Sequence, residues 1–246
     1  METLIEVDGL SFEIGDKLIL NNISFQVQRG DITAILGSSG SGKTTVLKHL
    51  LGIYRSPGKS VTVLGKNPSE IDEKEQKAFY KQIGVLYQEG ALLNSMTVGE
   101  NLGLPLEQHS DLPDPLIEEI VRMKLHQVNL DGAYEKYPSE LSGGMLKRAA
   151  LARAIVMDPP LLFCDEPGAG LDPITMSKLD QLIMDLHKQL GMTVVMVTHE
   201  VPSTLNMADQ VVFLDNGSSI FQGTPKSALK SSPAIVQDFF ARGLGK

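Results

Sequence analysis

Short apolar runs recur along the chain, each bounded by glycine, aspartate or proline, and this pattern predicts a series of short β-strands. Ile32–Leu36 and Val194–Val197 have no alternation of apolar and polar positions, which is typical of strands covered on both faces. We therefore expect a mostly parallel central sheet. The expected strands are Ile5–Val7, Ser24–Val27, Ile32–Leu36, Val61–Leu64, Ile83–Leu86, Leu161–Cys164, Thr193–Thr198 and Val211–Leu214.

Helical stretches separate these runs, so the alternation predicts an α/β fold. Between about residues 89 and 160 amphipathic stretches follow one another without a strand, which predicts a helical subdomain inserted in the α/β core. We expect one domain over 1–246, with its core in 1–88 and 161–223, the subdomain at about 89–160 and a C-terminal helical tail at about 224–246. The expected helices are Lys43–Leu51, Asp72–Lys81, Val98–Leu106, Asp114–Gln127, Ser142–Met157, Pro173–Gln189 and Val201–Asn206.

The composition is typical of a folded protein and argues against one class of partner, nucleic acid. The 246 residues are 42% hydrophobic and 21% charged, which excludes wholesale disorder. A formal net charge of -8 argues against a protein whose main role is to coat nucleic acid, so we expect no nucleic-acid partner. The single cysteine, Cys164, excludes an internal disulfide, and we expect it to pack in the core.

The sequence offers no segment for crossing a membrane. The N-terminus lacks the basic and apolar regions of a secretory signal, so we expect the chain to stay in the cytosol. No stretch approaches the roughly 18 consecutive apolar residues of a spanning helix. Any role at a membrane should therefore act through a partner.

The most specific motif follows the expected strand Ile32–Leu36 and opens the next helix. It has the pattern G-x-x-x-x-G-K-T, in which glycines let backbone N–H groups turn inward around a triphosphate while the helix N-terminus adds partial positive charge. We expect Lys43 to bridge the β and γ phosphates and Thr44 to ligate Mg²⁺. The predicted phosphate loop comprises Gly37, Ser38, Ser39, Gly40, Ser41, Gly42, Lys43, Thr44 and Thr45.

Two carboxylates end the apolar strand Leu161–Cys164. Strand ends in open α/β folds form ligand-binding edges, so Asp165 can hold the Mg²⁺ shell and Glu166 can polarise a water for attack on the γ phosphate. Without other motifs, two acidic residues after a strand would usually be interpreted as a solvated turn. Because the same chain contains a phosphate loop, we favour a catalytic role for this pair.

A third motif, Leu141–Met145, places a serine and two glycines before a long helix. Ser142, Gly143 and Gly144 can form a second anion site, which one chain with one nucleotide does not need. Here the sequence resembles the ATP-binding subunits of ABC transporters, from Leu4 to about Gly223. Leu141–Met145 is similar to the family signature, although Met145 replaces the common glutamine.

That resemblance assigns further residues. Gln88 is similar to the Q-loop glutamine of the family, which implies that it contacts Mg²⁺ and water. The stretch Gly170–Asp172 is similar to the D-loop, and Asp172 is its last residue. His199 is similar to the switch histidine, which implies contact with the γ phosphate. It implies a P-loop NTPase core with N-terminal antiparallel strands. It also implies ATP with Mg²⁺, and a head-to-tail dimer in which each ATP lies between the phosphate loop of one chain and Ser142–Gly144 of a second copy.

The stretch Gln88–Asn101 is similar to the ATPases of MCE-type lipid transporters, including the Mla phospholipid system, and Asp172–Thr175 agrees. This implies transport of lipid, most simply phospholipid, between envelope membranes. It implies an integral membrane permease docked on Glu89–Asn101, an MCE-type periplasmic lipid-binding subunit, and a place on the cytoplasmic side of the inner membrane.

Two alternatives stay open. The ATPase of another importer, for example for polar amino acids, would share every catalytic residue and differ in its permease. A soluble ABC ATPase of translation or DNA repair usually carries two cassettes or a coiled-coil insertion, and this chain has neither. The adenine-stacking residue is also open, because Ile14 stands where many members place an aromatic and Phe12 lies nearby.

Overall fold

The structure is a computed structural model that describes residues 2–230 and 233–245. Its contacts divide the chain into two compact units. Residues 1–73 and 193–246 form one unit, which we call the terminal unit, and residues 74–192 form the other, which we call the middle unit.

The N-terminal strands of the terminal unit form an antiparallel sheet. Strands β1 (Thr3–Ile14) and β2 (Lys17–Gln28) make a long hairpin with Ile14 opposite Lys17, and β4 (Val61–Val63) pairs with the other edge of β1. The predicted runs Ile5–Val7 and Ser24–Val27 lie inside the longer strands β1 and β2, whereas β4 ends one residue before the predicted Leu64. From Ile23 to Val27, buried and exposed side chains of β2 alternate.

The terminal unit also contributes parallel strands to a second sheet. Strand β3 (Ile32–Gly37) lies between β7 (Thr193–Val197) and β8 (Gln210–Asp215) and runs parallel to both. Every residue of β3 and β7 is buried, as their uninterrupted apolar patterns predict. The carboxyl ends of β3 and β7 therefore emerge at one edge, where the phosphate loop begins.

Strand β9 (Ser218–Gly223) was not among the predicted strands, and it pairs antiparallel with β8. Its sequence is half polar and its residues are only partly buried, so it lacks the apolar run that marks the other strands. The turn before it did carry a signal. Asn216 and Gly217 have φ values of 43° and 76°, which is the backbone that an Asn-Gly hairpin turn requires.

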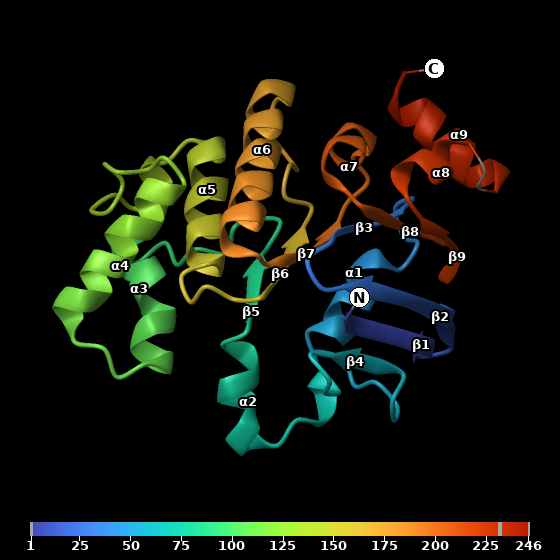
Figure 1. The fold of residues 1–246 in the computed structure, drawn as a ribbon, viewed down its shortest axis with the longest axis horizontal. Coiled ribbons are helices and arrows are strands. Elements are labelled where there is room, and N and C mark those ends of the chain that lie inside the picture. The colour runs from blue at the N-terminus through green and yellow to red at the C-terminus, as the bar shows by residue number, and fades with distance from the viewer. Residues whose placement is uncertain (1, 231–232, 246) are drawn as a thin grey trace. The chain divides into compact units, whose positions relative to one another are not determined.

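The helices of the terminal unit are α1 (Lys43–Leu50), α7 (Val201–Met207), α8 (Pro225–Lys230) and α9 (Ala234–Gly243), with a short 3₁₀ turn η1 (Pro68–Glu70). Helix α9 lies beside α7 and α8 (Figure 1). Its last residue, Gly243, comes so close to α7 that an added Cβ would lie 2.4 Å from Val201 Cγ2. Only a glycine allows this approach.

The middle unit contains two parallel strands, β5 (Ile83–Leu86) and β6 (Leu161–Asp165). Helices α3, α4 and α5 pack on one another, and α6 contacts α5 (Figure 1). Residues 89–160 contain helices and no strand, as predicted, although α5 ends before Met157. The helices are α2 (Glu73–Tyr80), α3 (Val98–His109), α4 (Asp114–Gln127), α5 (Gly143–Ala154) and α6 (Pro173–Leu190), with a 3₁₀ turn η2 (Pro138–Glu140).

Helix α5 packs tightly against β5 because small residues line the contact. Ala149, Ala150 and Ala152 are buried, and a Cβ on Gly84 of β5 would lie 2.3 Å from the carbonyl oxygen of Ala154. This close approach fixes the signature helix on the strand that leads to Gln88. None of the helices in the described ranges is both long and apolar enough to span a bilayer.

Candidate nucleotide-binding site

The phosphate loop connects β3 to α1 through backbone that needs glycine. Gly37 has φ of 152°, and an added Cβ would lie 2.2 Å from the carbonyl oxygen of Leu214. Gly42 caps α1 with φ of 103°, and a Cβ there would lie 2.6 Å from Leu20 Cδ2. The two glycines therefore allow the loop to fold tightly between β8 and β2.

Lys43 lies at the centre of this loop. Its Nζ atom donates hydrogen bonds to the carbonyl oxygens of Gly37 and Ser38, at 2.8 and 2.9 Å, and the residue is only 8% exposed. Thr44, the next residue of α1, is exposed at the first turn. The loop thus holds a cation inside a ring of backbone groups and presents a hydroxyl beside it, which is the arrangement that a polyphosphate with a divalent cation requires.

His199 follows β7 in the same unit. Its Nε2 atom lies 3.5 Å from Glu200 Oε1, and its side chain is 57% exposed. His199 and Ser38 of the phosphate loop both line one hollow of about 600 Å³. The structure therefore brings the predicted switch histidine to the phosphate loop, as expected from two neighbouring parallel strands that end at one edge.

Asp165 and Glu166 end β6 in the middle unit. The four residues before Asp165 are fully buried, and both carboxylate residues are half-buried. Glu166 has φ of 44°, so the chain turns sharply at this residue. The turn places two carboxylates together at the carboxyl end of a buried strand, as the sequence predicted.

Lys147 of α5 is a site residue that sequence reasoning missed. Its Nζ atom donates hydrogen bonds to the backbone carbonyl oxygens of Gln88 and, at 3.5 Å, of Glu166. Burial lowers the pKa of Lys147, and the nearby carboxylates of Glu89, Asp165 and Glu166 oppose that shift. One buried ammonium group therefore connects the Q-loop to the turn that follows the catalytic strand.

A second cation of α5 holds the segment after Gln88. Arg153 donates hydrogen bonds to the carbonyl oxygens of Ala91 and Gly90, at 2.7 and 3.1 Å. Gly90 itself lies against α5, with an added Cβ 3.4 Å from Ala150 Cβ. The start of the predicted permease-docking segment is thus attached to α5 by the side chains of Lys147 and Arg153.

The side-chain amide of Asn101, which the sequence did not identify as important, holds the rest of the predicted docking segment by hydrogen bonds. Asn101 of α3 is fully buried; its Oδ1 accepts from Leu93 N at 2.7 Å, and its Nδ2 donates to three carbonyl oxygens of the loop. Leu93 is 46% exposed, whereas Leu92 and Met96 are half-buried. The loop therefore has a fixed backbone and presents Leu93 outward.

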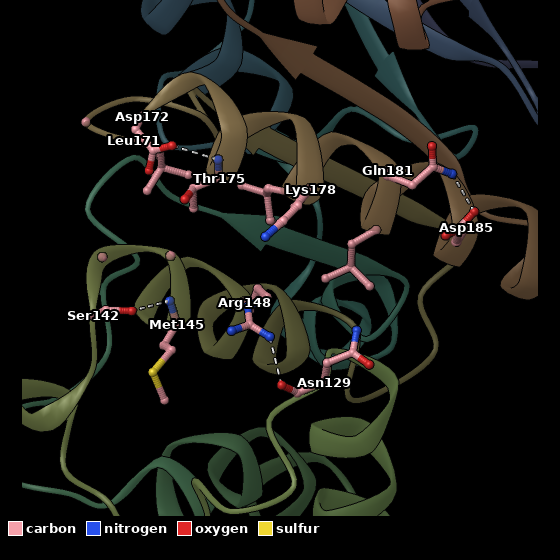
Figure 2. A pocket seen from close by; sticks show the side chains of 15 residues that line it. Asn129, Ser142, Met145, Arg148, Leu171, Asp172, Thr175, Lys178, Gln181 and Asp185 are labelled. Atoms are coloured by element: carbon pink, nitrogen blue, oxygen red, sulfur yellow. Dashed lines mark hydrogen bonds between the residues drawn. The ribbon is translucent and has the colours of Figure 1, made fainter.

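The signature and the D-loop meet in one pocket of about 690 Å³ in the middle unit (Figure 2). Ser142 caps α5 by accepting from Met145 N at 3.4 Å, and Asp172 caps α6 by accepting from the N–H groups of Ile174 and Thr175 at 3.0 and 3.1 Å. A side-chain hydrogen bond with Thr175, together with the backbone hydrogen bonds from Thr175 and Ile174, lowers the pKa of the Asp172 carboxyl. Two capped helix N-termini therefore open into the same space, which favours an anionic ligand.

The two signature glycines have different surroundings. A Cβ on Gly144 would lie 2.6 Å from Thr175 Cγ2, so this glycine is needed for α5 to approach α6. A Cβ on Gly143 would lie 3.7 Å from Leu171 Cδ2, which is an ordinary contact. Arg148, on the same pocket wall, donates to the carbonyl oxygens of Val128 and Asn129 (Figure 2).

The nearby aromatic and thiol groups have structural roles. Phe12 stacks on Tyr54, with ring centroids 4.9 Å apart, and meets His49 edge-on at 4.6 Å. Ile14 is 53% exposed. Cys164 is fully buried, and burial raises the pKa of its thiol to about 12, which agrees with the predicted core role.

The predicted residues thus fall into two groups. The terminal unit contains the phosphate loop and His199, and the middle unit contains Gln88, Asp165, Glu166, Ser142–Gly144 and Asp172. Within the middle unit, Lys147 connects Gln88 to Glu166, and one pocket joins the signature to Asp172.

Comparison with known proteins decides the family. The family described as ABC transporter matches residues 20–169, more than half of the chain. The chain belongs to the ABC transporter family. The resemblance inferred from the motifs is confirmed, and with it the α/β fold class and the assignment as an ATPase.

Individual relatives cover nearly the whole chain. The intermembrane phospholipid transport system ATP-binding protein MlaF of Haemophilus influenzae is 41% identical over 97% of this chain and 90% of its own length. The probable ribonucleotide transport ATP-binding protein mkl of Mycobacterium leprae is 38% identical over 97% of this chain and 69% of its own length. The dimeric ADP- and phosphate-bound ATP-binding cassette MJ0796 is 26% identical, has a TM-score of 0.80, and matches over 90% of this chain and 98% of its own.

Proposed function

We propose that this chain is the ATP-binding and ATP-hydrolysing subunit of an ABC transporter that moves phospholipid between envelope membranes. The observation that most supports ATP binding and hydrolysis is the Lys43 ammonium group, which is held by carbonyl groups of the phosphate loop. A second anion site, where α5 and α6 begin, supports a composite nucleotide site. The substrate class rests on the MlaF relative.

The phosphate loop binds the nucleotide in this proposal. When a triphosphate enters, the Nζ atom of Lys43 exchanges its hydrogen bonds with loop carbonyl groups for charge-assisted bonds to the β and γ phosphates. The N-terminus of α1, which begins at Lys43, adds partial positive charge beside this loop. Because the loop is already folded, little ordering cost opposes binding.

Thr44 and Asp165 fit Mg²⁺ by their chemistry, since hydroxyl and carboxylate oxygens are the ligands this ion prefers and nucleotide phosphates complete its shell. Gln88 adds an amide oxygen. When bound, the ion neutralises charge on the β and γ phosphates. The half-buried carboxylate of Asp165 is suited to this role because a dry site strengthens its attraction for the cation.

Glu166 orients the attacking water as general base, and His199 contacts the γ phosphate. Both lie at carboxyl ends of strands, β6 and β7 respectively, the position at which open α/β sheets bind ligands. Lys147 fixes the backbone of Glu166 and Gln88 together, so a displacement of the Q-loop would move the base as well.

The working form in this proposal is a head-to-tail dimer. Each ATP would lie between the phosphate loop of one chain and Ser142–Gly144 with Asp172 of the other. The dimeric MJ0796 cassette, with ADP and phosphate, supports this assembly. An integral membrane permease would dock at Glu89–Asn101, an MCE-type subunit would complete the system on the far side, and the ATPase would sit at the cytoplasmic face of the inner membrane.

The nucleotide site is tested by Lys43→Ala. ATP affinity and hydrolysis should both collapse, because the phosphate charges lose their buried cationic partner. Lys48→Ala changes a lysine five residues further along α1 and serves as the matched control, with near-normal activity expected. Normal hydrolysis by Lys43→Ala would show that nucleotide binds elsewhere.

The substrate is tested by transfer in a reconstituted system. The chain, purified with its permease from detergent extract, is placed in vesicles with labelled phosphatidylethanolamine, phosphatidylglycerol or ribonucleotide. We expect ATP-dependent movement of labelled phospholipid that Glu166→Gln abolishes. ATP-dependent movement of ribonucleotide, with phospholipid left in place, would contradict the assignment and favour the activity in the name of the mkl relative.

A further inference from the structure

The most exposed large hydrophobic side chain in the described part of the protein is Ile174, at 70%. It is the second residue of α6 and follows the D-loop directly. Its backbone N–H is fixed by the Asp172 cap, while the neighbouring Leu171 packs toward Gly143. The chain therefore holds an apolar side chain outward on a rigid helix start, and exposure of this kind usually indicates a contact surface.

The terminal unit contains a hollow that suits such a side chain. It measures about 600 Å³, and its apolar lining residues are Val201, Phe213, Ile235 and Phe239, which lie beside the charged lining residues Asp215, Asp238 and Arg242. Val201 and Phe213 are almost fully buried, and Phe239 packs edge-on against Phe213 with centroids 5.0 Å apart. Helix α9 lies against α7 beside this hollow, because Gly243 leaves no room for a Cβ next to Val201.

The position of this hollow indicates what enters it. Ser38 of the phosphate loop and His199 form part of its lining. In the proposed dimer, the phosphate loop faces Ser142–Gly144 of the second copy. Ser142–Gly144, Leu171, Asp172 and Thr175 line a single pocket in the middle unit (Figure 2). Ile174 lies between Asp172 and Thr175 in the chain, so the second copy brings its Ile174 to the same region together with its signature.

We infer that Ile174 of each chain inserts into the hollow between α7 and α9 of a second copy of this chain, beside Ser38 and His199. This inference rests on the proposed head-to-tail dimer and adds a specific apolar anchor to it. Two-fold symmetry repeats the contact, so each dimer buries two such side chains. The anchor would also connect closure of the dimer to the helix that follows the switch histidine.

Cross-linking tests the contact directly. Two differently tagged chains, both carrying Glu166→Gln to hold the ATP-bound state, receive Ile174→Cys in one and Ile235→Cys in the other. Both positions are exposed, and the native Cys164 is fully buried, so a short bismaleimide should react only at the new thiols. We expect an ATP-dependent cross-link between the two tagged chains. Ile53→Cys, exposed at 58% in the same unit as Ile235, is the control that should give none.

Dimer affinity gives an independent measurement. Ile174→Ala removes buried methylene and methyl groups at two symmetric contacts and should weaken the ATP-dependent dimer by at least about tenfold in sedimentation experiments. Ile235→Ala should weaken it too, and the double variant should lose less than the sum of both effects. Leu116→Ala, 40% exposed on α4, should leave the dimer unchanged.

The outcomes separate this inference from the proposed function. A normal ATP-dependent dimer without the cross-link, or with Ile174→Ala unaffected, overturns the anchor and leaves the composite site standing. A chain that never dimerises with ATP overturns both. Protection of the Ile235→Cys thiol by phosphatidylglycerol vesicles, with Ile174→Ala having no effect, would assign the hollow to lipid and overturn the anchor.

Discussion

The Nζ atom of Lys147 donates a hydrogen bond to the backbone carbonyl oxygen of Gln88, which lies 59 residues earlier in the chain. Because the same atom also reaches the carbonyl of Glu166, the Q-loop and the catalytic turn share one buried cation. In the proposed transporter, this lysine would transmit a movement of the proposed docking segment to Glu166, the proposed base.

Lys147→Met keeps the apolar stem and removes the three donors. Two carbonyl groups then lose a partner, so we expect a loss of about 1–3 kcal/mol in the free energy of unfolding and slower ATP hydrolysis. Urea unfolding and steady-state hydrolysis measure the two effects. Lys136→Met, at an exposed lysine of the same unit, should change neither. A Lys147→Met variant with wild-type values for both would contradict the structural link.

Glu166→Gln preserves shape and hydrogen bonding but removes the charge that orients the water. Hydrolysis should fall by about two to four orders of magnitude while ATP binding survives, and the ATP-bound dimer should accumulate. Rapid-quench hydrolysis and nucleotide filter binding test this. Glu119→Gln on the exposed face of α4 is the control. Wild-type turnover in Glu166→Gln would place the base elsewhere.

The composite site is tested by distributing two defects over a dimer. With Lys43→Ala on one chain and Gly143→Asp on the other, both defects fall in one site and the second site stays intact. With both changes on the same chain, each site is damaged. We expect hydrolysis in the first arrangement and almost none in the second, and equal activity in the two would argue for a monomeric enzyme. Gly143 has room for a side chain, so a folding defect is not expected.

Leu93→Glu tests the docking segment. Leu93 is exposed on a loop whose backbone is held by Asn101, so a charge there should repel an apolar permease helix without disturbing the fold. We expect loss of the permease on affinity purification, with unchanged ATP binding and thermal unfolding. Leu116→Glu, a comparably exposed leucine on α4, is the matched control. Full recovery of the permease with Leu93→Glu would reject this docking site.

We expect His49 to make the free energy of unfolding depend on pH. The residue is fully buried beside Phe12, its Nδ1 atom lies 3.0 Å from Ser56 Oγ, and desolvation lowers its pKa from 6.5 to about 4. Between these values the unfolded chain binds the extra proton, so acidification from pH 6.5 to 4 should cost up to about 3 kcal/mol. Urea unfolding across this range measures the loss, and His49→Gln should flatten it. An identical slope in that variant would exclude His49 as its source.

Much of the site could be predicted from sequence because its chemistry is local. The phosphate loop needs glycines, a lysine and a threonine at fixed spacing within one strand-to-helix turn, and such spacing is visible without a fold. The buried strands were also visible, since both of their faces are apolar. Strand β9 was missed because its half-polar residues pair through the backbone, and only the Asn216–Gly217 turn indicated a hairpin.

Only tertiary structure could reveal the groups that connect these motifs. In the sequence, Lys147 is one cation of an ordinary helix and Asn101 one amide of another. The fold buries both and gives them backbone carbonyl partners. The close packing of α5 on β5 brings Lys147 to Gln88, which is distant in the chain, and the path of the loop before α3 turns nearby carbonyl groups toward Asn101. Sequence alone thus indicated the residues that we propose bind and hydrolyse a nucleotide. The partners of a buried polar group depend on long-range packing, which no local pattern encodes, so only the fold decided how those residues are held.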